Sequence, residues 1–139
     1  MGRVIAIDYG QKRTGLAATD ELQMIASPLC TVPTVKVMDF LRDYIQREKV
    51  DVLVVGEAVQ MNGSPSSSAE FIEPFVRLLS RTFPGIPVER VDERFTSKMA
   101  SRTILHSGAK KKERQDKGLI DRVSAAIILQ SYLERKGMD

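Results

Sequence analysis

The sequence contains a single cysteine and a single histidine, and aromatic residues make up only 6% of its 139 residues. Cys30 alone cannot form a disulfide within the chain, so we expect a reducing compartment and interpret Cys30 as a small buried hydrophobe. One cysteine and His106 do not provide a pair of ligands with zinc spacing. The few aromatic residues argue against a platform on which single-stranded bases stack.

Long hydrophobic runs are also absent. No segment approaches the ~20 consecutive apolar residues that a membrane span needs, and Asp8 interrupts the first apolar stretch, which excludes a secretory signal peptide. We therefore expect a cytoplasmic protein without a membrane partner. The length and the composition, 42% hydrophobic and 28% charged, predict a single globular domain over residues 1–139.

The order of predicted elements indicates the fold class. RVIAID at 3–8 and TGLAAT at 14–19 predict two antiparallel strands, and 25–32 predicts a third, at an edge because Pro28 interrupts it. Further predictions are strands over 51–56 and 86–91, and helices over 35–49, 67–81, 96–108 and 119–136, with Thr34 and Ser67 as N-caps. Helical crossovers make the later strands parallel to the first. The result is an α/β fold with a five-stranded mixed sheet, order 3-2-1-4-5, and helices on both faces.

Acidic residues follow the predicted parallel strands. Asp8 ends the first, Glu57 the fourth, and Asp92 with Glu93 the fifth, while Asp121 begins the last helix. Functional groups of open α/β sheets gather beyond the carboxyl ends of the strands. Clustered carboxylates repel one another unless a cation intervenes, and oxygen ligands suit Mg²⁺ or Mn²⁺.

Each acidic residue also has a structural interpretation. Asp8 could form a turn before Gly10, and Asp121 could interact only with the helix N-terminus. Asp92 and Glu93 are adjacent on an extended segment, so only one should face a metal. Asp20 and Glu21 fall at the opposite end of the sheet, where a turn is expected.

Basic residues are concentrated between Lys98 and Arg122, where eight basic and three acidic residues give a local charge of +5. Such a concentration is typical of phosphate binding, although a solvated loop and helix face would look the same. Metal-assisted phosphodiester hydrolysis fits both the acidic and the basic residues, with Asp8 as the bridging ligand on the central strand.

Four segments resemble the YqgF family, also called RuvX and described as Holliday junction resolvases, within the ribonuclease H-like superfamily. They are IDYGQKRTGLAATD, VVGEAVQMNGS, VDERFTSKMA and IDRVSAAIILQSYL, and the resemblance runs nearly end to end. It implies a ribonuclease H-like three-layer fold and an acidic metal site at Asp8, the Asp92–Glu93 pair and Asp121. It also implies maturation of the 5′ end of pre-16S rRNA; resolution of branched DNA is the older proposal.

The resemblance gives roles to further residues. Lys12 and Arg13, at the tip of a hairpin bracketed by Gly10 and Gly15, would approach a phosphate backbone near Asp8. Arg94 and the loop residues Lys110, Lys111, Lys112 and Arg114 would bind nucleic acid as well. Ser124, Ala125 and Ala126 fit a last helix that packs close to the sheet.

Two positions carry hypotheses of their own. Many family members have Leu-Pro where this chain has Glu57-Ala58, and we hypothesise that Glu57 joins the metal site, since its strand neighbours that of Asp8. Tyr9 is the one aromatic residue expected to touch a substrate.

Alternatives remain open at this point. A non-catalytic RNA-binding factor of ribosome assembly could retain the fold, and Asp8-Tyr9-Gly10 before a hairpin also opens ATP-binding folds, which need two such domains. The sequence does not distinguish RNA from DNA, or a monomer from a homodimer.

Overall fold

The computed structural model describes residues 2–57, 69–92 and 117–137. The strands are β1 (Arg3–Asp8), β2 (Arg13–Thr19), β3 (Ala26–Pro33), β4 (Val50–Glu57) and β5 (Val88–Asp92). The helices are η1 (Thr34–Lys36), α1 (Val37–Arg47), α2 (Ala69–Thr82) and α5 (Lys117–Gly137). Several predictions concern residues outside the described ranges: the cap at Ser67, the helix over 96–108, and the site residues Glu93, Arg94, Lys110, Lys111, Lys112 and Arg114.

The strands form one five-stranded sheet in the order β3-β2-β1-β4-β5, as predicted. β2 is antiparallel to both β1 and β3, whereas β4 is parallel to β1 and to β5. The predicted edge position of β3 is also confirmed, and the β2–β3 register shifts between Leu16 and Ala17, next to Pro28. The α/β fold class is therefore confirmed.

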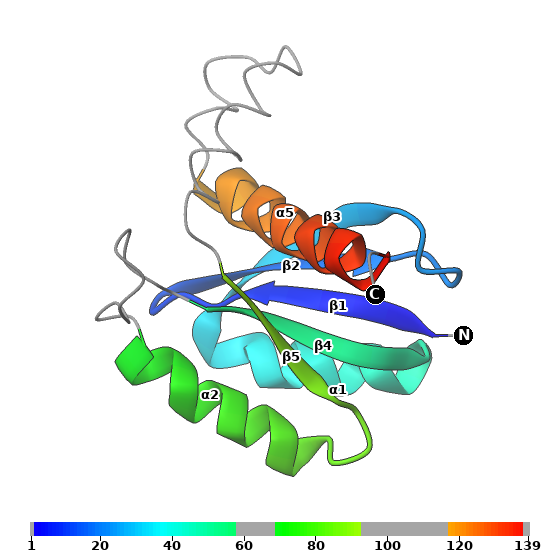
Figure 1. Ribbon diagram of the computed structural model, residues 1–139. Helices are drawn as coiled ribbons and strands as arrows, with labels where there is room; N and C mark the ends of the chain where they lie inside the picture. The colour runs from blue at the N-terminus through cyan, green and yellow to red at the C-terminus, as the bar shows by residue number, and fades with distance from the viewer. Residues whose placement is uncertain (1, 58–68, 93–116, 138–139) are drawn as a thin grey trace.

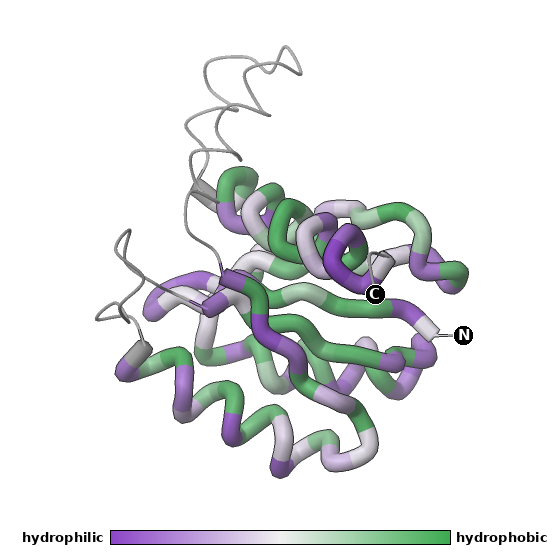
Figure 2. The backbone as a smooth tube through the Cα atoms, viewed as in Figure 1, coloured by the Kyte–Doolittle hydropathy of each residue, from purple (hydrophilic) through white to green (hydrophobic). Residues whose placement is uncertain are grey.

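Helices cover both faces of this sheet, with α5 on one face and α1 and α2 on the other (Figure 1). Alternate residues of β1 supply the two cores: Val4 and Ala6 pack with α5, while Ile5 and Ile7 pack with α1 and α2. Hydrophobic β1 and β4 lie between the helical layers in Figure 2. The two-residue period of the strands thus assigns each side chain to a helical layer.

The start of α1 differs from the prediction. Thr34 was expected to cap the helix, but neither the cap of η1 nor that of α1 carries a side-chain hydrogen bond. The Thr34 hydroxyl instead donates to the main-chain carbonyl of Gly10, at 2.6 Å. The prediction of a Thr34 cap is wrong because a partner distant in sequence takes the hydroxyl.

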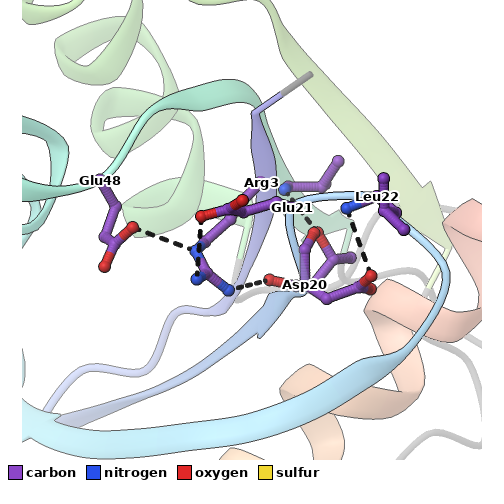
Figure 3. Close-up of polar contacts among 7 residues, drawn as sticks. Arg3, Asp20, Glu21, Leu22 and Glu48 are labelled. Atoms are coloured by element: carbon purple, nitrogen blue, oxygen red, sulfur yellow. Dashed lines mark hydrogen bonds and ion pairs between the residues drawn. The ribbon is translucent and has the colours of Figure 1, made fainter.

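The turn between β2 and β3 lies at the amino end of β1 (Figure 3). The Asp20 carboxylate accepts the main-chain N–H of Leu22, at 3.2 Å, and further main-chain donors follow. Beside it, Arg3 forms ion pairs with Glu48, at 3.3 Å, and Glu21, at 3.9 Å. The prediction that Asp20 and Glu21 form a turn, away from the acidic end of the sheet, is confirmed.

Within the described ranges, we find no helix whose length and apolar character would suffice for a membrane span.

Candidate active site

The carboxyl ends of the parallel strands bring acidic residues to one end of the sheet. Asp8 is the last residue of β1, Glu57 the last of β4 and Asp92 the last of β5. Glu57 and Asp92 are paired in the β4–β5 register. Asp121 lies in the first turns of α5, whose N-terminal end is at the same end of the sheet (Figure 1). The predicted strand ends and helix start are therefore found at one end of the molecule.

Gly15 connects Asp8 with Asp121. It is paired with Asp8 across the β1–β2 ladder, and a methyl group on its Cα would overlap the main-chain carbonyl of Asp121. The helix can approach β2 this closely because glycine has no side chain. Asp8 and Asp121 therefore flank the same glycine, one beside it in the sheet and one above it.

A second contact, from Thr31, fixes the start of α5 against the sheet. Thr31 of β3 is paired with Gly15 on the side away from β1. Its hydroxyl donates to the main-chain carbonyl of Gly118, at 2.5 Å, and accepts from Arg122, at 3.5 Å. One turn further on, Ser124 and Ala125 are buried against the sheet, as the small side chains predicted. The N-terminal end of α5 thus packs across the Asp8–Gly15–Thr31 row.

The pleat of the sheet does not bring all the acidic residues together. In β1 the even-numbered residues face α5, so Asp8 shares the face on which Asp121 lies. In β4, Leu53 and Val55 face α1 and α2. By the same alternation, Glu57 also lies on the face covered by α1 and α2. Asp92 follows Val91, which faces α5, so Asp92 also alternates away from it. Glu57 and Asp92 thus neighbour each other on the face opposite to Asp8.

The β1–β2 hairpin places a cationic tip beside Asp121. Arg13 forms an ion pair with Asp121 through its Nε atom, and its side chain is 42% exposed against 19% for Asp121. The exposed residues Gln11 and Lys12 continue the tip, and with Gly10 they complete the lining of a pocket of about 240 Å³. The structure therefore brings two of the predicted nucleic-acid-binding residues, Lys12 and Arg13, to a predicted metal ligand.

Thr34, which follows β3, stabilises this hairpin through hydrogen bonds to its main chain. Its main-chain N–H donates to the carbonyl of Lys12, at 3.0 Å, and its hydroxyl donates to Gly10 and lies 2.9 Å from the hydroxyl of buried Thr14. A side chain at Gly10 would meet the carbonyl of Arg13. The main chain of the tip is therefore fixed at several points.

Tyr9, the aromatic residue expected to touch a substrate, packs against α2. Its ring stacks on Phe75 of α2, with centroids 4.0 Å apart, and lies 6.0 Å from Phe71. Burial raises the pKa of the Tyr9 hydroxyl. Because Tyr9 alternates onto the α1 and α2 face, its ring anchors α2 to the sheet.

The donor atoms at this site suit a hard divalent cation. Asp8 and Asp121 offer only oxygen ligands, the type that Mg²⁺ and Mn²⁺ prefer. Among residues 2–57, 69–92 and 117–137, no group of three metal-ligating side chains is found. Glu93, the third predicted ligand, lies outside those ranges. The two described carboxylates therefore fit part of a metal site in chemistry and in position.

Thr31 and Thr34 are structural residues of the site that the sequence does not reveal. Both side chains act on segments distant in sequence, at Gly118 and at Gly10. Thr31, in a strand, is ordinarily interpreted as a β-former, and Thr34, before a helix, as an N-cap, so no local signal identifies either contact.

Comparison with known proteins agrees with the resemblance seen in the motifs. A profile described as "RuvX: Holliday junction resolvase" matches residues 2–135. A protein of Parabacteroides distasonis is 60% identical over 136 residues, covering 98% of this chain and 97% of its own length. One from Flavobacterium johnsoniae is 59% identical over 136 residues, covering 98% and 99%. Both carry the name "Putative pre-16S rRNA nuclease".

Two solved structures share the fold at low sequence identity. The Holliday junction resolvase of fowlpox virus has a TM-score of 0.58 at 11% identity and covers 96% of this chain and 99% of its own. Thermus thermophilus RuvC, solved with a Holliday junction substrate, has a TM-score of 0.56 at 18% identity and covers 99% and 97%. The predicted ribonuclease H-like fold is thereby confirmed, and the chain belongs to the RuvX family of nucleases.

Proposed function

We propose that this chain is a divalent-metal-dependent nuclease in which Asp8 and Asp121 hold the catalytic cation. The observation that carries the proposal is the placement of both carboxylates around Gly15, next to the Lys12–Arg13 tip. Acidic side chains that would repel one another, with cationic side chains beside them, suit a bound cation and a phosphate. For the third ligand we propose Glu93, because alternation in β5 assigns Asp92 to the opposite face from Asp8.

The residues of this site would act on a phosphodiester as follows. A bound Mg²⁺ or Mn²⁺ supplies a water of lowered pKa and stabilises charge on the oxygen that leaves. Asp8 and Asp121 would hold that cation at the end of β1, and Lys12 and Arg13 would orient the neighbouring phosphates. In hydrolysis the water oxygen bonds to phosphorus while one P–O ester bond breaks, and the departing oxygen takes up a proton.

For the substrate we propose the 5′ region of the 16S rRNA precursor. Relatives that are 54–60% identical across nearly the whole chain are named for pre-16S rRNA, and the resemblance in the motifs implies its 5′ end. The resolvase structures are less than 20% identical and support the fold alone. Processing of this precursor would place the protein in the cytoplasm. We propose no membrane partner.

The test is a cleavage assay with two labelled substrates, a precursor 16S rRNA 5′ segment and a four-way DNA junction, in Mg²⁺ or Mn²⁺. Asp8→Asn and Asp121→Asn each remove one ligand charge at nearly constant volume. Each should lower the cleavage rate by about a hundredfold or more, since even the outer partners of metal ligands are worth 10–100-fold. Asp39→Asn on α1 is the charge-matched control, because Asp39 is an exposed carboxylate paired with Arg42.

Cleavage of the RNA alone, lost in both variants and kept in Asp39→Asn, is the expected result. Cleavage of the junction alone would overturn the proposed substrate. Tight RNA binding without cleavage would overturn the nuclease and favour a non-catalytic assembly factor.

A further inference from the structure

Arg13 and a metal ion would compete for the Asp121 carboxylate. Arg13 donates from Nε to Oδ2 of Asp121, one of the two carboxylates to which we assign the cation. The carboxylate has a second oxygen, but two positive charges held on one carboxylate repel each other. Either Arg13 leaves that oxygen when the metal binds, or the metal binds more weakly because Arg13 stays.

The hairpin main chain around Arg13 is held in place, whereas the Arg13 side chain is partly exposed. Thr34 binds the carbonyls of Gly10 and Lys12, on the two sides of the tip. The Arg13 side chain is 42% exposed, and Asp121 is the partner of its ion pair. Rotation about its side-chain bonds would therefore move the guanidinium without disturbing the hairpin.

A pocket beside the ion pair could accommodate the guanidinium group together with a bound anion. It measures about 240 Å³ and is lined by Gly10, Gln11, Lys12, Arg13 and Asp121. One water molecule takes about 30 Å³ of liquid volume, so the space exceeds that of several waters. Lys12 adds a second cation at its rim. An anion such as a phosphate fits a pocket with these charges.

We propose that Arg13 is an exchangeable counter-ion. It neutralises Asp121 before the cation arrives, and it transfers to a substrate phosphate when the cation takes the Asp121 oxygen. A mostly buried carboxylate near a second one is costly without a partner, so the exchange keeps Asp121 neutralised in both states. It also couples metal binding to phosphate binding through one side chain. This inference rests on the proposed function, since it requires Asp121 to be a metal ligand.

The first experiment measures Mn²⁺ binding by isothermal titration calorimetry, on the full chain without nucleic acid. Arg13→Gln should raise the Mn²⁺ affinity about two- to fivefold, the size expected for a partly exposed ion pair. Arg13→Lys keeps the charge and should stay close to the original affinity. Arg47→Gln is the matched control, because Arg47 forms an exposed ion pair with Asp43 on α1, and it should leave the affinity unchanged.

The second experiment measures the salt dependence of binding to an RNA duplex, kept intact at low temperature and checked on a gel. In Mn²⁺, Arg13→Gln should reduce the slope of log K against log salt by about one, as expected for one lost phosphate contact. In EDTA the slope should not change, because Arg13 is then paired with Asp121. Both results would support the exchange.

Changes in Mn²⁺ affinity or in salt slope other than those expected would overturn the proposed exchange. If Arg13→Gln weakens Mn²⁺ binding, or matches Arg47→Gln, then Arg13 only orients Asp121. If its slope falls equally in EDTA and in Mn²⁺, Arg13 binds phosphate without any exchange. Equal Mn²⁺ binding by the unmodified chain and by Asp121→Asn would overturn the metal site itself, a failure that the Arg13 variants alone would not produce.

Discussion

The main chain of Asp121 rests directly on the Cα atom of Gly15. This contact sets the distance between α5 and the sheet at the point where Asp8 ends β1. Gly15 is also the ladder partner of Asp8. The absence of a side chain at Gly15 therefore determines how the two proposed metal ligands face each other. The contact can be tested by adding a methyl group at Gly15.

We predict that Gly15→Ala both destabilises the protein and impairs the site. The added methyl would meet the main chain of Asp121, which cannot move without moving the helix. Overpacking of this kind costs about 1–3 kcal/mol in the free energy of unfolding. Urea denaturation measures this loss, and the cleavage assay should show a larger relative loss than the folded fraction explains.

The control is Gly85→Ala, where an added methyl has open space around it. Its effect should stay within about 0.5 kcal/mol. If Gly15→Ala is as mild as Gly85→Ala, the close approach of α5 to β2 is not a constraint.

The second prediction concerns Thr34. Thr34→Val removes the hydroxyl that serves both Gly10 and Thr14, and Thr14 is fully buried. A buried polar group that loses its partner costs about 1–3 kcal/mol. Since Thr14 and Thr34 contact each other, the cycle of Thr14→Val, Thr34→Val and the double variant should show a coupling of at least about 0.5 kcal/mol.

Urea denaturation again supplies the measurement, with Val35→Thr as the reverse substitution at a neighbouring site that is 89% exposed. That control should be nearly neutral. Strict additivity of the two threonine variants would contradict the proposed network.

The strands were the most predictable part of this molecule. The range of β1 and the edge position of β3 agree with the structure, because an apolar run bounded by Gly10 and a proline within a strand are local signals. The sheet order followed from the alternation of strands and helices and from the handedness of crossovers.

The faces of the strands could not be predicted in the same way. Within the predicted strand 51–56, residues 52–55 form a continuous apolar run, because β4 is covered on both faces and shows no alternation. The sequence therefore gives no indication of which layer Glu57 faces. Its position at the strand end was predicted, whereas its separation from Asp8 by the pleat emerged only from the packed structure.

Contacts between segments distant in sequence could not be predicted either. Gly15 was interpreted as a hairpin glycine, and its contact with Asp121 depends on where α5 packs. Thr34 had the position and chemistry of an N-cap, but the hairpin offered its hydroxyl a different acceptor.

The third prediction is a pH dependence at the β2–β3 turn. Main-chain N–H groups of Ile25, Met24 and Leu22 donate to the Asp20 carboxylate and lower its pKa. A depressed pKa means that the charged form stabilises the fold above the ordinary pKa of Asp, and that this contribution is lost as the pH falls through the folded-state pKa.

Thermal unfolding between pH 2 and pH 6, followed by circular dichroism, checks this expectation. The midpoint should fall with decreasing pH more steeply in the unmodified chain than in Asp20→Asn, whose amide oxygen accepts hydrogen bonds without titrating. Asp39→Asn is the control, since Asp39 is an exposed aspartate on α1. Identical slopes for the unmodified chain and Asp20→Asn would refute the role of Asp20.

The last prediction separates stability from function at the end of the sheet remote from the site. Gln23 has a φ angle of 57°, in the left-handed region. Its Nε2 donates to the carbonyl of Gly2, at 2.6 Å, and to Asp51, at 3.1 Å, while its Oε1 accepts from Lys136, at 3.0 Å. One side chain thus ties the amino ends of β1 and β4 to the end of α5.

Gln23→Ala and Gln23→Gly both lose these hydrogen bonds, but glycine adopts the left-handed conformation without strain. Alanine should therefore destabilise the protein more than glycine, by about 1 kcal/mol in urea denaturation. An alanine variant as stable as the glycine variant would show that the φ angle of Gln23 carries no strain. Neither variant should alter cleavage by the folded protein, because Asp8 and Asp121 lie at the opposite end of the sheet. Unchanged cleavage in Gln23→Ala, beside lost cleavage in Gly15→Ala at a comparable loss of stability, would assign the Gly15 effect to the geometry of the site rather than to the fold.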